Sequence, residues 1–212
     1  MAKYVCVLPY AYKPYYEACS KTIKLDNVLA VDNTVDNIGI MAAHNLGIKY
    51  MQSKGADWLI IMSAALRFGP KGGRDFIDEL DKRPDHLVVE AIGVYGWHLI
   101  AFHRRTIEKV GKWDENFTPY GYDDLDYSYR IQLAFGLDGR TQLWEKAPVE
   151  VSDMGMAHSL KKAHVQPDND KLRNYYASKW GVLPEDDHDH AYEKPFNGEF
   201  NSVDYWPGDY KL

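Results

Sequence analysis

Short apolar runs alternate with helical patterns along the first third of the chain. The runs cover Lys3 to Leu8, Val28 to Val31 and Trp58 to Met62, and their length and β-branched content are typical of buried strands. Apolar residues at helical spacing predict a short helix over Tyr15 to Thr22 and a longer one over Ile38 to Ser53. Because strands and helices alternate, the sequence predicts an α/β fold with a mostly parallel central sheet flanked by helices.

The middle of the chain continues this alternation without an internal repeat. We expect a turn at Gly69 to Gly73, then a helix at Asp75 to Asp81 and an extended segment at His86 to Val94. A strand at Trp97 to Phe102 and a helix at Thr106 to Val110 should follow. The remaining elements are a loop and helix over Tyr120 to Phe135 and a strand at Pro148 to Val151. The sequence therefore predicts one domain over residues 1–181.

The last part of the chain, residues 182–212, shows no periodicity. An acidic stretch, Glu185 to Asp189, is followed by proline, glycine and scattered aromatic residues. The aromatic residues Phe196, Phe200, Tyr205 and Trp206 are expected to anchor this irregular C-terminal tail on the domain or on a partner. Whether the chain forms a homo-oligomer through this tail is left open by the sequence.

Composition limits the class of protein. With 212 residues, 45% of them hydrophobic, the chain can bury a core of its own. The formal net charge of -6 disfavours an anionic polymer as the partner. Cys6 and Cys19 are the only cysteines, too few for a disulfide framework or a cysteine-based zinc site. Since the sequence shows no signal-peptide pattern and no apolar stretch of membrane-spanning length, we expect a cytoplasmic protein without a membrane span.

Carboxylates gather in the segment Tyr120 to Arg130, where a loop is predicted to enter a helix. Asp123, Asp124 and Asp126 are too close in sequence to share one helical face, since neighbours on a helix are three or four residues apart. They could cap the helix and face solvent, or they could form a catalytic site. Asp126 and Arg130 are one helical turn apart, so we expect them to form a structural ion pair.

Several segments, taken in chain order, share motifs with a known family. They are Leu8 to Tyr10 and Val31 to Asn33, the Asn37 to Ile48 run with its Asn-x-Gly-x-x-x-x-x-Asn-x-Gly pattern, Gly55 to Ile61, the Arg104 to Phe117 run, Gly121 to Asp126, Met156 to Lys162, and Tyr175 to Gly181. Together they resemble an inverting nucleotide-sugar glycosyltransferase of the Rossmann-like GT-A type, of the family-two group or the galactosyltransferase C-terminal domains. The likeness covers roughly residues 3–181.

The resemblance implies a reaction and the residues for it. The expected activity is transfer of a hexosyl group, with inversion, from a nucleotide-diphosphate sugar to an acceptor hydroxyl. Gly121 to Asp126 is similar to the family's Gly-x-Glu-Asp-x-Asp element, which implies that Asp124 is the catalytic base, with Asp123 beside it. A nucleotide-binding half would extend to about Arg67. The implied donor-binding residues are Pro9, Tyr10, Asp32, Asn37, Arg67, Trp97 and His158.

The chain departs from the family where a metal is normally held. The family's third strand ends in an Asp-x-Asp element for Mg²⁺ or Mn²⁺, but here the sequence is Met62-Ser63-Ala64-Ala65, which offers no carboxylate. Either His158 binds a metal with a remaining carboxylate, or no metal is used and basic side chains stabilise the diphosphate. The candidates for that second role are Arg67, Lys71, Arg74, Lys161 and Lys162.

The missing metal element leaves a second function class open, a catalytically inactive module that binds a sugar nucleotide or a glycan. The identity of the sugar does not follow from the sequence, because single hydroxyl contacts decide it. The acceptor is equally open between a protein, a glycan, a small molecule and a modified DNA base.

Overall fold

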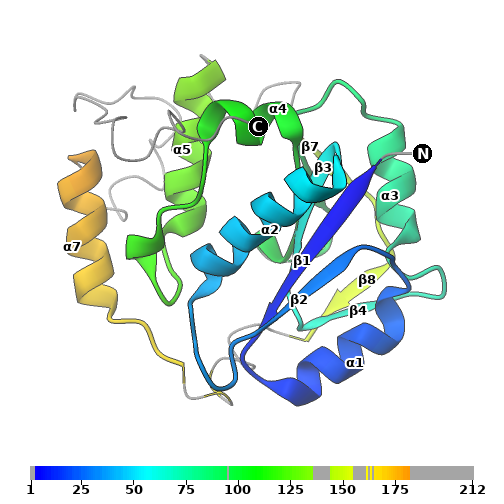
Figure 1. The fold of residues 1–212 in the computed structure, drawn as a ribbon, viewed down its shortest axis with the longest axis horizontal. Coiled ribbons are helices and arrows are strands. Elements are labelled where there is room, and N and C mark those ends of the chain that lie inside the picture. The colour runs from blue at the N-terminus through cyan, green and yellow to red at the C-terminus, as the bar shows by residue number, and fades with distance from the viewer. Residues whose placement is uncertain are drawn as a thin grey trace.

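A computed structural model describes residues 3–94, 96–135, 144–154, 161, 163 and 165–181 of the chain (Figure 1). Its main feature is a six-stranded sheet with the strand order β2-β1-β3-β6-β5-β7. The strands are β1 (Tyr4–Tyr10), β2 (Val28–Asp32), β3 (Trp58–Met62), β5 (Val88–Ala91), β6 (Leu99–His103) and β7 (Trp144–Ala147). Only β6 runs antiparallel to its neighbours, so the predicted mostly parallel sheet is confirmed.

Helices cover both faces of this sheet. They are α1 (Lys13–Ile23), α2 (Ile40–Lys54), α3 (Arg74–Asp81), α4 (Arg104–Val110), α5 (Asp123–Phe135) and α7 (Asn169–Trp180), and a second, two-stranded sheet pairs β4 (Leu66–Phe68) with β8 (Val151–Asp153). No helix in the described part of the chain combines the length and the apolar character needed to cross a bilayer.

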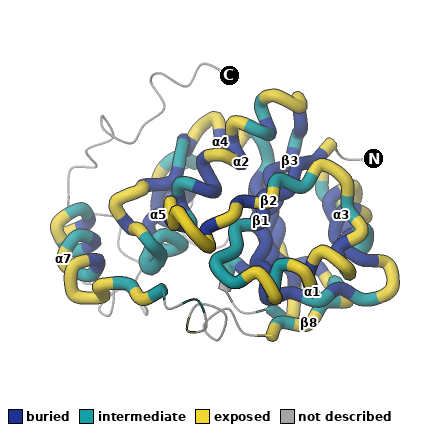
Figure 2. Tube along the Cα trace, turned by 60° about the horizontal axis from the view of Figure 1, so that its bottom comes forward, coloured by how far each residue is buried: buried dark blue, intermediate teal, exposed yellow. Residues whose placement is uncertain are grey.

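Two apolar cores result from the alternation of side chains along each strand. Val5 and Val7 of β1 point to one face and pack with buried residues of α2, α4, α5 and α7. Tyr4, Cys6 and Leu8 point to the other face and pack with buried residues of α1 and α3. The tube in Figure 2 shows β1 and β3 buried, with exposed residues concentrated on the outer helices and turns. Cys6 and Cys19 are free and buried, as their small apolar character predicts.

Two of the predicted strand boundaries were wrong. The strand expected from Trp97 begins only at Leu99, because Trp97 and His98 form a 3-10 turn (Gly96–His98) and Leu99 is the residue paired with Met62. The strand expected at Pro148 to Val151 is instead β7, which ends at Ala147, and a separate strand that begins at Val151. Proline has no N–H to donate to a strand ladder, so Pro148 marks the gap between them.

A buried cluster of charges joins α5 to α7. The Asp126–Arg130 ion pair is confirmed, with Arg130 Nε 3.1 Å from Asp126 Oδ2 and side-chain exposures of 0% and 1%. The Nζ atom of Lys179 lies 2.6 Å from Asp126 Oδ1 and 2.7 Å from Asp114 Oδ2. Trp180 Nε1 donates to Asp126 Oδ1 at 2.9 Å. Two carboxylates are therefore balanced by two cations, which is the condition under which buried charges are tolerated.

The same cluster fixes the turn that precedes α5. Tyr175 Oη on α7 donates to Asp114 Oδ2 at 2.7 Å, and Arg130 Nη1 donates to the Lys112 carbonyl at 2.8 Å. Burial opposes the ionisation of Asp114, but the charge of Lys179 and the hydrogen bonds to the carboxylate outweigh it and hold the pKa of Asp114 below its usual value. The chain around residues 110–117 is thus tied to both helices, which lie side by side in Figure 1.

Replacing Lys179 by methionine should destabilise the protein strongly. The methionine would fill most of the volume but leave Asp114 and Asp126 with one cation fewer, a change that costs about 3–5 kcal/mol for a buried ion pair. Urea denaturation would measure the loss. Lys171→Met, on the exposed side of the same helix, is the control and should change stability by less than about 0.5 kcal/mol. Equal stability of the two variants would contradict a structural role for the cluster.

Candidate active site

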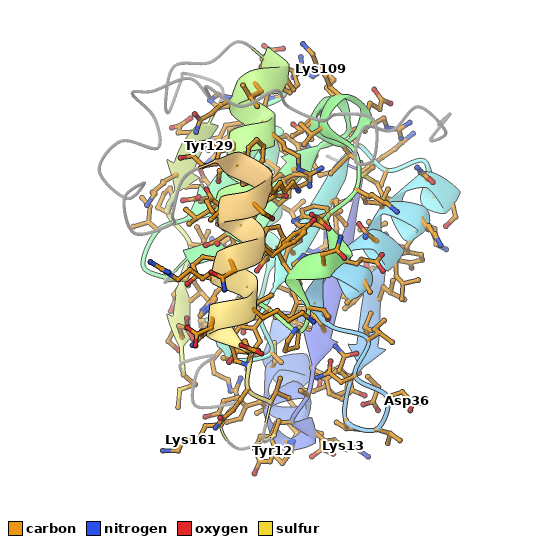
Figure 3. All side chains as sticks on the ribbon, turned by 90° about the vertical axis from the view of Figure 1, so that its left-hand side faces the viewer. Tyr12, Lys13, Asp36, Lys109, Tyr129 and Lys161 are labelled. Carbon is orange, nitrogen blue, oxygen red and sulfur yellow. The ribbon has the colours of Figure 1, made fainter. Side chains whose placement is uncertain are left out.

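A pocket of about 210 Å³ lies at the carboxyl ends of strands β1 and β3. Pro9 and Tyr10 come from the end of β1, and Met62 and Ser63 from the end of β3. The opposite wall is the loop before α5 with the first turn of that helix. Ligands of open α/β sheets bind in this position, because the loops that follow the strands meet there. Figure 3 shows that the segments after β1 and β2 lie at one end of the molecule, where Tyr12, Lys13 and Asp36 are labelled. The other end carries Lys109 and Tyr129.

Asp123 and Asp124 both line this pocket from the first turn of α5. Asp123 Oδ1 accepts a hydrogen bond from the backbone N–H of Gly121 at 3.0 Å, and Asp124 Oδ1 accepts one from that of Leu125 at 2.9 Å. Gly121 and Tyr122 have φ angles of 121° and 61°, which lie in the left-handed region. A non-glycine residue with positive φ stores strain, so the backbone at Tyr122, directly before α5, is held against its local preference by the surrounding structure.

Asp123 has a shifted protonation equilibrium. Burial, followed by the charge of neighbouring Asp124, raises the pKa of Asp123 to about 7. A carboxyl group with such a value exists in both protonation states near neutral pH, which suits transfer of a proton to or from a bound hydroxyl. Pairs of carboxylates with this property are concentrated at functional sites.

The glycine and asparagine residues of the Asn37 to Gly47 pattern hold the loop in place. Gly39 has a φ of 84°, and a side chain there would collide with Thr118 Oγ1. Ile40 N donates to the Pro119 carbonyl at 3.0 Å. One turn further, the Asn45 amide bonds to both the N–H and the carbonyl of Trp113, at 2.8 and 3.0 Å. The pattern therefore attaches α2 to the segment that leads into the carboxylates.

Four of the sequence-predicted donor residues, Pro9, Tyr10, Asn37 and Trp97, lie in the pocket wall. Asp32 lies beside the wall rather than in it. Its carboxylate accepts hydrogen bonds from Thr34 N and Oγ1, at 2.9 and 2.6 Å, and bonds to Tyr10. Burial and then this contact raise the pKa of Tyr10 to about 12, so its hydroxyl stays protonated and donates to Asp32.

Arg67 does not contribute to the pocket wall. Its Nη1 atom donates to the carbonyls of Ala64 and Leu66, at 3.0 and 2.6 Å, and its guanidinium lies over the Tyr15 ring. Arg67 thus braces the chain that leaves β3.

The other candidate cations are also elsewhere. Lys71 pairs with Asp75 at 3.2 Å, and Arg74 pairs with Asp26 at 3.6 Å and lines a different pocket with Lys3 and Lys54. Lys161 is exposed. His158 and Lys162, like the tail from residue 182, lie outside the described residues.

His44 is a pocket residue that the sequence motifs did not predict. It lies on α2, lines the pocket, is 4% exposed, and packs against the Trp113 ring. Its Nδ1 atom is buried without a hydrogen-bond partner among the described residues. Burial lowers the pKa of His44 to about 3, so the imidazole is neutral. The available signal was a polar residue among the apolar positions of the α2 pattern, but that signal alone does not distinguish a ligand contact from a core histidine.

The end of β3 does not offer the ligands of a hard divalent cation. Ser63 Oγ accepts from Ala65 N at 3.1 Å, and Ala64 and Ala65 have no side-chain donor atoms. Within the described ranges, no three histidine, cysteine or acidic side chains form a group that could hold a metal ion. The acidic side chain on the adjoining strand β8, Asp153, bonds to His98 Nδ1. The residues described at this position therefore do not fit Mg²⁺ or Mn²⁺.

No family model and no curated protein sequence matches the chain. Solved structures do. TarS from S. aureus has a TM-score of 0.51 at 8% identity, covering 87% of this chain and 44% of that chain. A TarS structure of residues 1–349 has a TM-score of 0.50 at 6% identity, covering 87% and 74%. The catalytic domain of Drosophila β1,4-galactosyltransferase 7, in complex with xylobiose, has a TM-score of 0.47 at 14% identity, covering 69% and 65%.

These likenesses show the fold alone. The chain has the mixed α/β architecture found in glycosyltransferase structures, with the mostly parallel sheet between helices. It spans less than two thirds of the length of two of the three chains above.

The raised pKa of Asp123 predicts a pH dependence of stability. The folded protein retains a proton that the unfolded chain releases, so the contribution of Asp123 to stability falls as the pH rises from about 4 to about 7. Asp123→Asn cannot ionise and should be more stable than the parent protein above about pH 7, with a flatter profile below it. Urea unfolding across this pH range would measure both effects.

The control for this experiment is Asp78→Asn, on the exposed face of α3. It should follow the parent protein at every pH. If the stability of Asp123→Asn also followed that of the parent protein at every pH, the pKa of Asp123 would not be raised in the folded protein.

Proposed function

We propose that the protein is an inverting glycosyltransferase that uses a nucleotide-diphosphate sugar as donor. The observation that carries the proposal is the pair of carboxylates, Asp123 and Asp124, inside a pocket at the carboxyl ends of β1 and β3. The fold is compatible with this activity, since glycosyltransferase structures share it. The motif resemblance, which assigns the base to Asp124, is an independent support from the sequence.

The chemistry of inversion explains why a carboxylate is needed there. The acceptor oxygen attacks the anomeric carbon while the bond from that carbon to the diphosphate oxygen breaks, and the electron pair leaves with the diphosphate. The acceptor hydroxyl must lose its proton on the face opposite the leaving group. In the proposal Asp124 takes this proton, and Asp123 beside it raises the basicity of the pair, because two adjacent carboxyl groups do not both ionise readily.

The residues on the different sides of the pocket suggest where the donor and the acceptor would bind. Pro9, Tyr10 and Asn37 lie on the side formed by β1 and the start of α2, where the donor nucleotide would bind. Trp97, in the 3-10 turn, also lines the pocket and packs edge-on against Phe102 and Tyr127, so it offers an apolar ring for a sugar face. Mn²⁺ or Mg²⁺ enters no step of this proposal, since the described residues do not fit either ion.

Asp124→Asn should abolish transfer while donor binding is retained. Asparagine is nearly the same size but cannot accept the proton, and loss of a general base lowers the rate by roughly 10²- to 10⁴-fold. A panel of nucleotide sugars, screened by thermal shift with and without Mn²⁺, would first identify a donor. Transfer to a set of acceptors and donor hydrolysis would then be compared between the parent protein and Asp124→Asn.

Asp78→Asn again provides the control and should leave both binding and transfer unchanged. Donor binding without transfer or hydrolysis by the parent protein would contradict the enzymatic proposal and identify a binding module. Full activity of Asp124→Asn would refute only the assignment of the base to Asp124 and would leave the glycosyltransferase proposal standing.

A further inference from the structure

His44 has hydrogen-bonding capacity that the protein does not use. It lies on the second turn of α2, on the same helical face as Ile40, and both residues line the pocket. The side chain is 4% exposed, and its Nδ1 atom is buried without a partner in the part of the chain that the structure describes. The ring packs edge-on against that of Trp113, with the centroids 5.2 Å apart, so its position in the wall is fixed.

Contacts behind the ring connect His44 to the helix that carries the pocket carboxylates. Trp113 also stacks on Tyr127 of α5, with the ring centroids 4.0 Å apart and the planes 5° from parallel. Tyr127 follows Asp123 by four residues, which is one helical turn. At the start of α2, the first backbone N–H of the helix donates to the carbonyl of Pro119 at 3.0 Å. The pocket face of α2 therefore adjoins α5 and the loop before it.

The chemistry of the imidazole ring indicates what kind of group it can bind. Burial lowers the pKa of His44 to about 3, so the ring is neutral and has one N–H donor and one acceptor nitrogen. A phosphate oxygen that carries no proton can only accept a hydrogen bond. A hydroxyl group can both donate and accept, so it matches either nitrogen in either tautomer. Near the two pocket carboxylates, the sugar of a substrate is the part that offers such groups.

We propose that His44 is a specificity-determining residue that forms a hydrogen bond with a hydroxyl group of the bound sugar, on the donor or on a sugar acceptor. The inference rests on the proposed function and deepens it, because it names the part of the substrate that α2 contacts. A sugar with a hydroxyl at this position satisfies the imidazole, whereas a sugar without it leaves a buried polar group unpaired, and sites of this kind discriminate against such analogues. No covalent bond is formed or broken at His44.

His86 provides an internal comparison. Its Nδ1 atom is also buried without a partner among the described residues, but its Nε2 atom lies 2.9 Å from Glu145 Oε2, and the residue is absent from the pocket wall. Burial of a nitrogen is thus common to both histidines, while the position at the pocket belongs to His44. A response to sugars that depends on this position should appear at His44 and not at His86.

NMR of the full chain with ¹⁵N-labelled histidine tests the contact directly. The probes are UDP-glucose, UDP-galactose and GDP-mannose, with UDP and GDP as the matched ligands without a sugar, and His44→Gln assigns the resonances. We expect a nucleotide sugar that binds to shift the His44 ring nitrogens, while the free nucleotide and the His86 resonances show no such change. A response only to methyl glycosides added with the nucleotide would place the hydroxyl on the acceptor. Equal responses to nucleotide and nucleotide sugar, or none to any bound sugar, would overturn the inference.

Binding of deoxy sugars isolates the hydrogen bond. His44→Leu removes both nitrogens at similar volume and should weaken binding of the sugar ligand by about 3- to 10-fold, while nucleotide binding is unchanged. Removing the contacted hydroxyl from the ligand should weaken binding to the parent protein by the same factor, but should have no further effect in His44→Leu. His44→Gln, which retains a polar group, is the second variant and should give a smaller loss. If removal of each hydroxyl weakened binding equally in the parent and in both variants, His44 would not contact the sugar.

His86→Leu is the control variant and should bind every ligand as the parent does. Sugar transfer by a protein whose His44 does not respond to the sugar would refute this inference and leave the proposed function standing. A hydroxyl-dependent response of His44 in a protein that transfers no sugar would refute the proposed function and leave a sugar-binding site at His44. Binding of none of the sugar ligands would contradict both.

Discussion

Lys179 is the residue on which the position of the candidate active site depends. Its ammonium group lies between Asp114, in the turn before α5, and Asp126, inside α5, and each contact is shorter than 3 Å. Arg130 adds bonds from the same helix to the carbonyls of Val110 and Lys112. Asp126 follows Asp123 by three residues, which is less than one helical turn. The contacts that fix the position of Asp126 therefore also fix the first turn of α5, which lines the pocket. The position of Asp123 and Asp124 in the pocket wall thus depends on a charge cluster whose residues are not part of the described wall.

The site itself concentrates features that oppose stability. Asp123 is a carboxyl group in a setting that raises its pKa, Tyr122 has a positive φ, and His44 has a buried nitrogen without a partner among the described residues. Each of these features is unfavourable for folding. The compact cores on both faces of the sheet and the Lys179 cluster offset them. Such a distribution is expected where a fold is retained for the geometry of a pocket.

The sequence predicted the sheet well because its strands have strong local signals. The β3 run Trp58–Met62 is apolar and buried at all five positions, and its predicted bounds were correct. The strands β4 and β7 and the helix α7 were not predicted, since β4 and β7 have only three and four residues and α7 has few apolar positions. Trp97 and His98 were assigned to a strand because the following residues are apolar, while the pairing of Leu99 with Met62 decides where the strand begins.

The site was predictable only where neighbours in sequence are neighbours in space. Asp123 and Asp124 are adjacent residues, so their crowding was visible from the sequence. The approach of Asp153 to His98 joins residues 55 positions apart through the β4–β8 sheet, and no local pattern indicates it. Similarly, the basic residues after β3 suggested a phosphate site from their charge, but Arg74 and Lys71 pair with acidic side chains outside the pocket.

A base in the pocket that assists direct displacement at the anomeric carbon requires that the configuration of this carbon is inverted. Proton NMR of the first glycosylated product, recorded before any spontaneous change of configuration, measures this most directly through the coupling constant of the anomeric proton. We expect a product whose anomeric configuration is inverted relative to the nucleotide-sugar donor. A product with retained configuration would contradict it, because a single displacement assisted by Asp124 cannot give that outcome.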